Sequence, residues 1–74
     1  MTTENPIKPL LRTLATTLAD AAQYADEGYE AMRNGNQNQA IGTIIYLEHL
    51  LPTAQALYTS AIALHRLPRK GGAQ

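Results

Sequence analysis

Cysteine is absent from this chain, and that absence removes several classes of protein at once. Without thiols there are no disulfides and no thiolate metal sites, so nothing indicates a secreted disulfide scaffold. A chain of 74 residues forms one domain at most, and a single core of that size is usually marginal unless something staples it. Because disulfides are excluded, we expect oligomerisation to stabilise this small core.

A net charge is lacking as well. The formal charge at pH 7 is zero, so no overall field concentrates the protein on nucleic acid or anionic lipid. The charges are nevertheless placed unevenly along the chain. Acidic residues gather before the midpoint, and basic residues follow the last apolar ones: Asp20, Asp26, Glu27 and Glu30, then Arg66, Arg69 and Lys70.

No residue pattern typical of catalysis or metal binding occurs. The chain contains no HExxH sequence and no glycine-rich phosphate loop. Glu48 and His49 are adjacent, so on a helix they point about 100° apart and cannot share a metal, whereas di-iron bundles place Glu and His three residues apart. We therefore expect no enzyme activity, no catalytic residues, no cofactor and no metal site.

Neither a secretory signal nor a membrane span is favoured. The opening residues, MTTENPIKP, lack a basic region followed by an apolar core, so we expect a cytoplasmic location. Residues 41–64 are long enough to cross a bilayer and are followed by basic residues. Glu48, His49 and Pro52 near the centre of that segment would be costly in lipid, so a membrane is an unfavoured partner.

What the first half does contain is a helical period of apolar and small residues. They recur at alternating spacings of four and three, which places them on one stripe of a helix. The stripe consists of Ile7, Leu11, Leu14, Leu18, Ala21, Ala25, Gly28 and Met32. Pro6 and Pro9 suit the lead-in or first turn, where a missing N–H costs little. The pattern predicts a helix from Pro9 to Arg33.

A short polar segment follows this stripe and predicts a hinge. Asn34 and Gly35 form a typical helix stop, because Gly adopts the left-handed conformation without a side-chain clash. Asn36 is suited to cap the next helix with its side-chain oxygen. So short a connection predicts two antiparallel, packed helices hinged at Gly35.

The second half, from Gln37 to Leu67, is more apolar than one neighbouring helix can cover. Pro52 interrupts it, and a proline inside a helix costs about 3 kcal/mol. Two outcomes are open. We favour one kinked helix, because the apolar stripe keeps its phase across the proline; the alternative is a break near Leu50 and Leu51, with Pro52 as the first residue of a third helix.

Four positions between residues 24 and 52 have the spacing of a known repeat: Gly28, Gly35, Ala40 and Pro52. They match the small-residue, turn, small-residue and terminal-proline positions of the tetratricopeptide repeat, which this segment resembles. The resemblance implies a helical hairpin that binds peptides. The chain departs from that family at two positions: Glu27 stands where the repeat usually has Leu, and Leu47 stands where the repeat usually has Ala. No second repeat follows to cover the first. We interpret the spacing as convergence between hairpins.

These features together predict an all-α antiparallel helical hairpin over residues 1–67, with residues 68–74 as a flexible basic tail. The hairpin is expected to self-associate, most simply as a dimer that forms a four-helix bundle. The residues expected to face a second copy or another protein are Ile41, Ile45, Leu57 and Ile62. The expected function is a small non-enzymatic protein–protein interaction module, such as an adaptor, a chaperone-like protein or a regulator.

The alternative is a nucleic-acid-binding regulator that uses the basic chain ends. A hairpin hinged at Gly35 brings both ends together, so basic residues from each could contact phosphate. These residues are Arg66, Arg69 and Lys70, joined by Lys8 and Arg12. The acidic face of the first helix repels phosphate, and charges that cap a helix and solvate a tail explain the basic end more simply.

Overall fold

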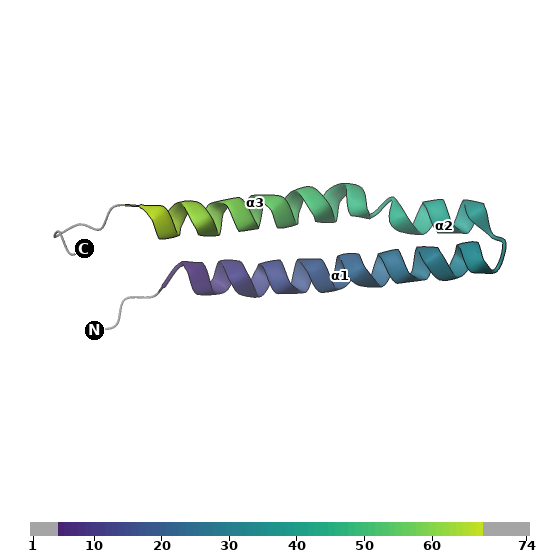
Figure 1. The fold of residues 1–74 in the computed structure, drawn as a ribbon, viewed down its shortest axis with the longest axis horizontal. Helices are drawn as coiled ribbons and strands as arrows, with labels where there is room; N and C mark the ends of the chain where they lie inside the picture. Colours follow the sequence, from purple (N-terminus) through teal and green to yellow (C-terminus); the bar gives the residue numbers. More distant parts are fainter. Residues whose placement is uncertain (1–4, 68–74) are drawn as a thin grey trace.

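The computed structural model describes residues 5–67, which form an antiparallel helical hairpin (Figure 1). Helix α1 spans Ile7–Arg33, α2 spans Gln37–Ile44 and α3 spans Leu47–Arg66. Helices α2 and α3 follow one another along the length of α1, so the first and last helical turns lie at the same end of the molecule (Figure 1). The predicted all-α hairpin is confirmed, whereas the predicted tail lies outside the described residues.

Helix α1 begins two residues before the predicted start. The side-chain Oδ1 of Asn5 accepts a hydrogen bond from the backbone N–H of Ile7 at 2.9 Å. The carbonyl of Asn5 also accepts from the N–H of Lys8 at 3.2 Å. Asn5 therefore satisfies donors that a helix start leaves unpaired, and it lets the helix begin ahead of Pro9.

The hinge between α1 and α2 has the geometry that the sequence predicts. Gly35 has a φ of 79°, in the left-handed region. The N–H of Gly35 donates to the carbonyl of Met32, and the N–H of Asn36 donates to that of Ala31, both at 2.9 Å, which is the Schellman arrangement. The side chain of Asn36 then accepts from the N–H of Gln39 at 3.1 Å and caps α2.

The second arm is bent, but the bend lies before the proline. Pro52 is inside α3, and the α-helical pattern is interrupted at Ile45 and Tyr46. There the N–H of Glu48 bonds three residues back, to the carbonyl of Ile45 at 3.0 Å, and ψ values of -22° and -20° match a 3₁₀ turn. The preferred reading of one kinked helix is close to the observed arrangement, and a third helix starting at Pro52 is wrong.

The bend lies on the N-terminal side of Pro52, where a proline disturbs a helix. A proline has no N–H for the carbonyl four residues back, here that of Glu48, and its ring crowds that carbonyl. The 3₁₀ turn at Ile45 and Tyr46 directly precedes Glu48. The aromatic ring of Tyr46, in that turn, stacks on the ring of Tyr24 with 4.9 Å between ring centroids. The bend is therefore packed against α1.

Small side chains line the seam where α1 meets α2 and α3. Within residues 5–67, the buried residues are Thr17, Ala21, Gly28 and Ala31 on α1, and Ala40, Ala54 and Ala61 opposite. The arms are in close contact at Gly28, where an added Cβ would meet Cγ2 of Ile44 and would lie 3.4 Å from the carbonyl oxygen of Ala40. The fully buried positions of the seam carry small side chains, and larger ones such as Leu14, Leu47 and Leu57 are partly buried beside them.

Candidate interaction surface

The two broad sides of the hairpin differ in character. Helical positions seven residues apart share one side of a helix. We call residues spaced by seven a series. On each side of the seam, the margin, or border where the two arms meet, is formed by one series from α1 and one series from the second arm. One margin is apolar and the other is polar, and we call the two sides the apolar face and the polar face.

Large apolar side chains with about half of their surface exposed gather on the apolar face. On α1, Leu11, Leu18 and Met32 are 46 to 49% exposed, and they are separated by seven and by fourteen residues, so they share one side of the helix. On α3, Leu51 and Tyr58 are 51 and 54% exposed at the same spacing. Farther from the seam on the same face lie Tyr29 on α1 and Ile41 on α2, which are 66 and 52% exposed. The apolar face therefore holds seven of the ten large apolar side chains that are exposed among the described residues.

A groove shows that the two arms contribute to this face together. It has a volume of about 370 Å³ and runs between α1 and α3. Its lining residues are Leu14, Leu18, Leu51, Ala54, Gln55 and Tyr58. Gln55 is the single side chain of the lining with a polar amide, so the groove offers contact area to an apolar partner and few groups to orient a small ligand.

The polar face has a second groove, nearer the hinge. Its volume is about 480 Å³, and it is lined by Asp26, Glu27, Glu30, Ala31, Asn34, Asn36, Gln39 and Thr43. Local pairs satisfy part of this polar surface, since Arg33 bridges Glu30 at 2.9 Å and the amide of Gln23 donates to Glu27 at 3.0 Å. The Arg33–Glu30 pair is exposed, so it contributes little to stability. The acidic residues thus serve as a solvated side of the hairpin.

The four residues predicted to face a partner lie on three different sides of the arm. Ile41 and Ile62 belong to the same seven-residue series as Gln55, so they lie on the apolar face. Leu57 is partly buried toward α1. Ile45, which is 50% exposed, shares its series with Arg66 on the outer side of the arm. The predicted set therefore marks the apolar face at its outer edge only.

Sequence reasoning missed the centre of the apolar face. Leu18, Leu51 and Tyr58 belong to the apolar stripes, and large apolar residues on a stripe are normally assigned to the seam. The available signal was the parallel series of small residues, with Ala21 and Ala54 one helical turn away from Leu18 and Leu51. When a row of small residues lies beside a row of large apolar residues on the same helix, the small residues indicate where the arms meet closely. The large residues then lie along the border of that contact.

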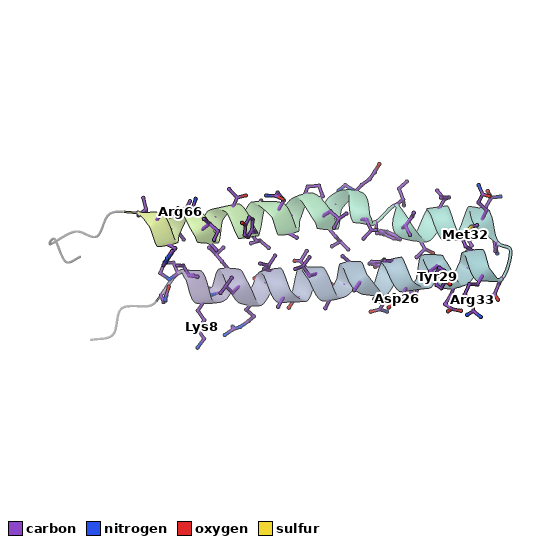
Figure 2. The ribbon with its side chains drawn as sticks, in the orientation of Figure 1. Lys8, Asp26, Tyr29, Met32, Arg33 and Arg66 are labelled. Carbon is purple, nitrogen blue, oxygen red and sulfur yellow. The ribbon has the colours of Figure 1, made fainter. Side chains whose placement is uncertain are left out.

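The basic residues of the described chain do not converge on one point. Figure 2 shows Lys8 on the side of α1 that faces away from α3, and Arg66 in the last turn of α3. Arg12 is exposed on α1, one turn after Lys8. Arg69 and Lys70, the other predicted phosphate contacts, lie outside the described residues.

Two further features are absent from residues 5–67. No three His, Asp or Glu side chains in this part of the chain come together in a group that could hold a metal ion. In the same range, no helix is both long enough and apolar enough to span a bilayer.

Comparison with known proteins gives no matching family model, no matching curated protein and no matching solved structure. The similarity to a tetratricopeptide repeat thus rests on four residue positions. One of the four does not behave as in a repeat, because Pro52 lies inside α3 and does not end a helix. The spacing of Gly28 and Ala40 has a local explanation, since these two residues meet across the seam.

Proposed function

We propose that this protein is a small non-enzymatic protein–protein interaction module of the adaptor or regulatory type. It acts as a dimer of hairpins, paired through their apolar faces in a four-helix bundle. The observation that carries this proposal is the difference between the two faces. An isolated hairpin needs no apolar face, because its two arms already cover each other along the seam.

The free energy of burial supports the pairing. Burying a large apolar side chain completely contributes about 1.5 to 3 kcal/mol. The seven side chains of the apolar face are about half exposed, so fourteen of them in a dimer contribute roughly 10 to 20 kcal/mol. Association costs roughly 4 to 15 kcal/mol in lost freedom. The balance favours a dimer even when some of these side chains stay partly in water.

Sedimentation equilibrium with one variant on each face tests the proposal. We expect the wild-type protein to have twice the chain mass of 8.1 kDa at micromolar concentration. Leu51→Glu places a charge on the apolar face and should give monomers. The matched control is Thr53→Glu, which places the same charge two residues away on an exposed position of the polar face and should leave the dimer intact. A wild-type mass of 8.1 kDa with full helicity would contradict the dimer.

The runner-up function is nucleic-acid binding through the basic chain ends. Its support is the position of Lys8 and Arg66 at the end of the hairpin away from the hinge (Figure 2), with Arg12 one turn after Lys8 on α1. Affinity for RNA or DNA that falls steeply between about 50 and 200 mM salt would favour this function. We rank it second because Lys8 and Arg66 do not face a common site.

A further inference from the structure

The hinge contains a pair of residues with a reactivity of its own. Asn34 is followed by Gly35, and both are exposed in the link between α1 and α2. The backbone nitrogen that follows an asparagine can attack the side-chain carbonyl carbon of that asparagine and close a five-membered imide ring. Glycine in the second position has no side chain to hinder the attack. We propose that Asn34 is a site of spontaneous self-modification and that the folded hinge holds the reaction back.

The other asparagines lack this combination. Asn5 precedes a proline, which has no N–H and cannot close the ring. Asn36 and Asn38 each precede a glutamine of α2, whose side chain crowds the attacking nitrogen. We therefore expect Asn34 to be the most reactive of the four asparagines in the chain.

The reaction consumes water and releases ammonia. The nitrogen of Gly35 forms a bond to Cγ of Asn34, its proton passes to solvent, and Nδ2 leaves as ammonia. Water then opens the ring at one of its two carbonyls. Opening at the side-chain carbonyl gives aspartate, and opening at the main-chain carbonyl gives isoaspartate, in which the chain continues through Cβ and Cγ. Both products exchange one amide for one carboxylate, without oxidation or reduction.

Two features of the folded hinge oppose ring closure. Asn34 has a φ of -90° and a ψ of 8°, in the bridge region. The ring requires the nitrogen of Gly35 on the same side of the Cα–C bond as Cβ, and this ψ turns the nitrogen away. The N–H of Gly35 also donates to the carbonyl of Met32 at 2.9 Å, which keeps its proton in place. The cap of α1 must therefore open before the ring can close.

Either product weakens the cap that held the reaction back. A negative charge is unfavourable at a helix C-terminus, and Glu30 lies four residues earlier on α1. Position 34 also borders the groove of the polar face, which three carboxylates line. In isoaspartate, the chain gains a backbone atom at position 34. The hydrogen bonds from Gly35 and Asn36 back to Met32 and Ala31 both span that position, so their geometry is lost.

Mass spectrometry of the full-length protein, after incubation at mildly alkaline pH, tests the proposal. Cleavage after glutamate gives a fragment of residues 31–48, which contains Asn34, Asn36 and Asn38. In guanidinium chloride, Asn34 should react ahead of the other two. In native buffer its rate should be at least about tenfold lower, which corresponds to an opening free energy of about 1.4 kcal/mol. No reaction at Asn34 in denaturant, or equal rates in the two solutions, would overturn the proposal.

Three variants in native buffer test whether the cap controls the rate at Asn34. Asn36→Ala removes the oxygen that accepts from Gln39 and should speed the reaction about 2- to 30-fold, as expected for loss of an N-cap. The matched control Asn38→Ala changes an exposed residue two positions later and should have no effect. Gly28→Ala weakens the seam and not the cap, so it should also leave the rate unchanged. An Asn36→Ala rate equal to wild type, or a Gly28→Ala rate raised as much, would contradict control by the cap.

The effect of the product is measured on a variant that imitates it. Asn34→Asp should lower the thermal midpoint at low salt, and the difference should shrink as salt screens the charge. Asn38→Asp places the same charge in the first turn of α2, where it is favourable, and should not lower the midpoint. An Asn34→Asp midpoint at or above that of wild type would overturn the weakening of the cap by aspartate. None of these outcomes depends on the proposed dimer.

Discussion

At the scale of single residues, the two glycines inside helices have opposite surroundings. Gly28 faces Ile44 and the backbone of Ala40 across the seam, whereas a Cβ on Gly42 would meet nothing within 4 Å. We expect Gly28→Ala to lower the free energy of unfolding by about 1 to 2 kcal/mol, because the added methyl overpacks the seam. Gly42→Ala should raise it by about 0.5 to 1 kcal/mol through helix propensity alone. Urea unfolding followed by circular dichroism measures both.

A second substitution identifies the cause of the loss at Gly28. Ile44 is β-branched and stiff in a helix, so its Cγ2 cannot easily move away from a new methyl group. Removing that group with Ile44→Ala should recover part of the stability that Gly28→Ala loses. If Gly28→Ala were as stabilising as Gly42→Ala, the arms would not be in contact at this point.

Gly35 is constrained by its own backbone and not by neighbours. Its φ is positive, and a Cβ there would have open space around it. Gly35→Val should therefore destabilise the protein by more than about 1 kcal/mol through left-handed strain alone. Gly35→Asn should cost less, because Asn tolerates this conformation. Thermal unfolding compares the two, and equal midpoints for Val and Gly would contradict the cap.

At the scale of elements, the bend in the second arm is the feature to test. Pro52 lies in the interior of α3, so Pro52→Ala should be neutral or should stabilise the protein by up to about 3 kcal/mol. The restored donor can pair with the carbonyl of Glu48, and helicity should rise. Amide hydrogen exchange should slow around Ile45 and Tyr46. Clear destabilisation would mean that packing of the Tyr24–Tyr46 stack depends on the bend.

The elements that local chemistry determines were predictable from the sequence. The hinge is one such element, because Gly35 and Asn36 each satisfy requirements within a few residues of themselves. The bend was misplaced because a proline disturbs the helix on its N-terminal side, and the turn at Ile45 and Tyr46 packs against Tyr24 on the other arm. A single sequence carries no direct sign of that contact.

The composition of the seam was harder to predict for a similar reason. Hydrophobicity favours leucine over alanine in a core, but the distance between two helices also depends on the smallest residues that face each other. Gly28 and Ala40 meet across the seam, whereas Leu18 and Leu51 lie at its margin with about half of their surface exposed. The centre of the apolar face therefore became visible only once the spacing of the arms was known.

At the scale of the whole molecule, the proposed dimer predicts that stability depends on assembly. Since the apolar faces would be covered only in that dimer, dilution should lower the thermal midpoint of the wild-type protein. The Leu51→Glu monomer, if it folds, should have a midpoint that does not depend on concentration. Circular dichroism melts over a hundredfold range of concentration measure the difference, and a constant wild-type midpoint would contradict the coupling.

The alanine seam has a thermodynamic consequence for the single hairpin. Heat capacity rises on unfolding mainly because apolar surface becomes hydrated. In the single hairpin only alanines are fully buried among the apolar side chains of residues 5–67, and the seam leucines keep part of their surface in water, so the heat-capacity change per residue should fall below the usual 12 to 15 cal/mol/K. Its stability curve is then shallow, with little curvature between cold and heat. Pairing of the apolar faces in the proposed dimer would add the missing heat capacity, and the sharpness of the thermal transition would then be a property of the pair.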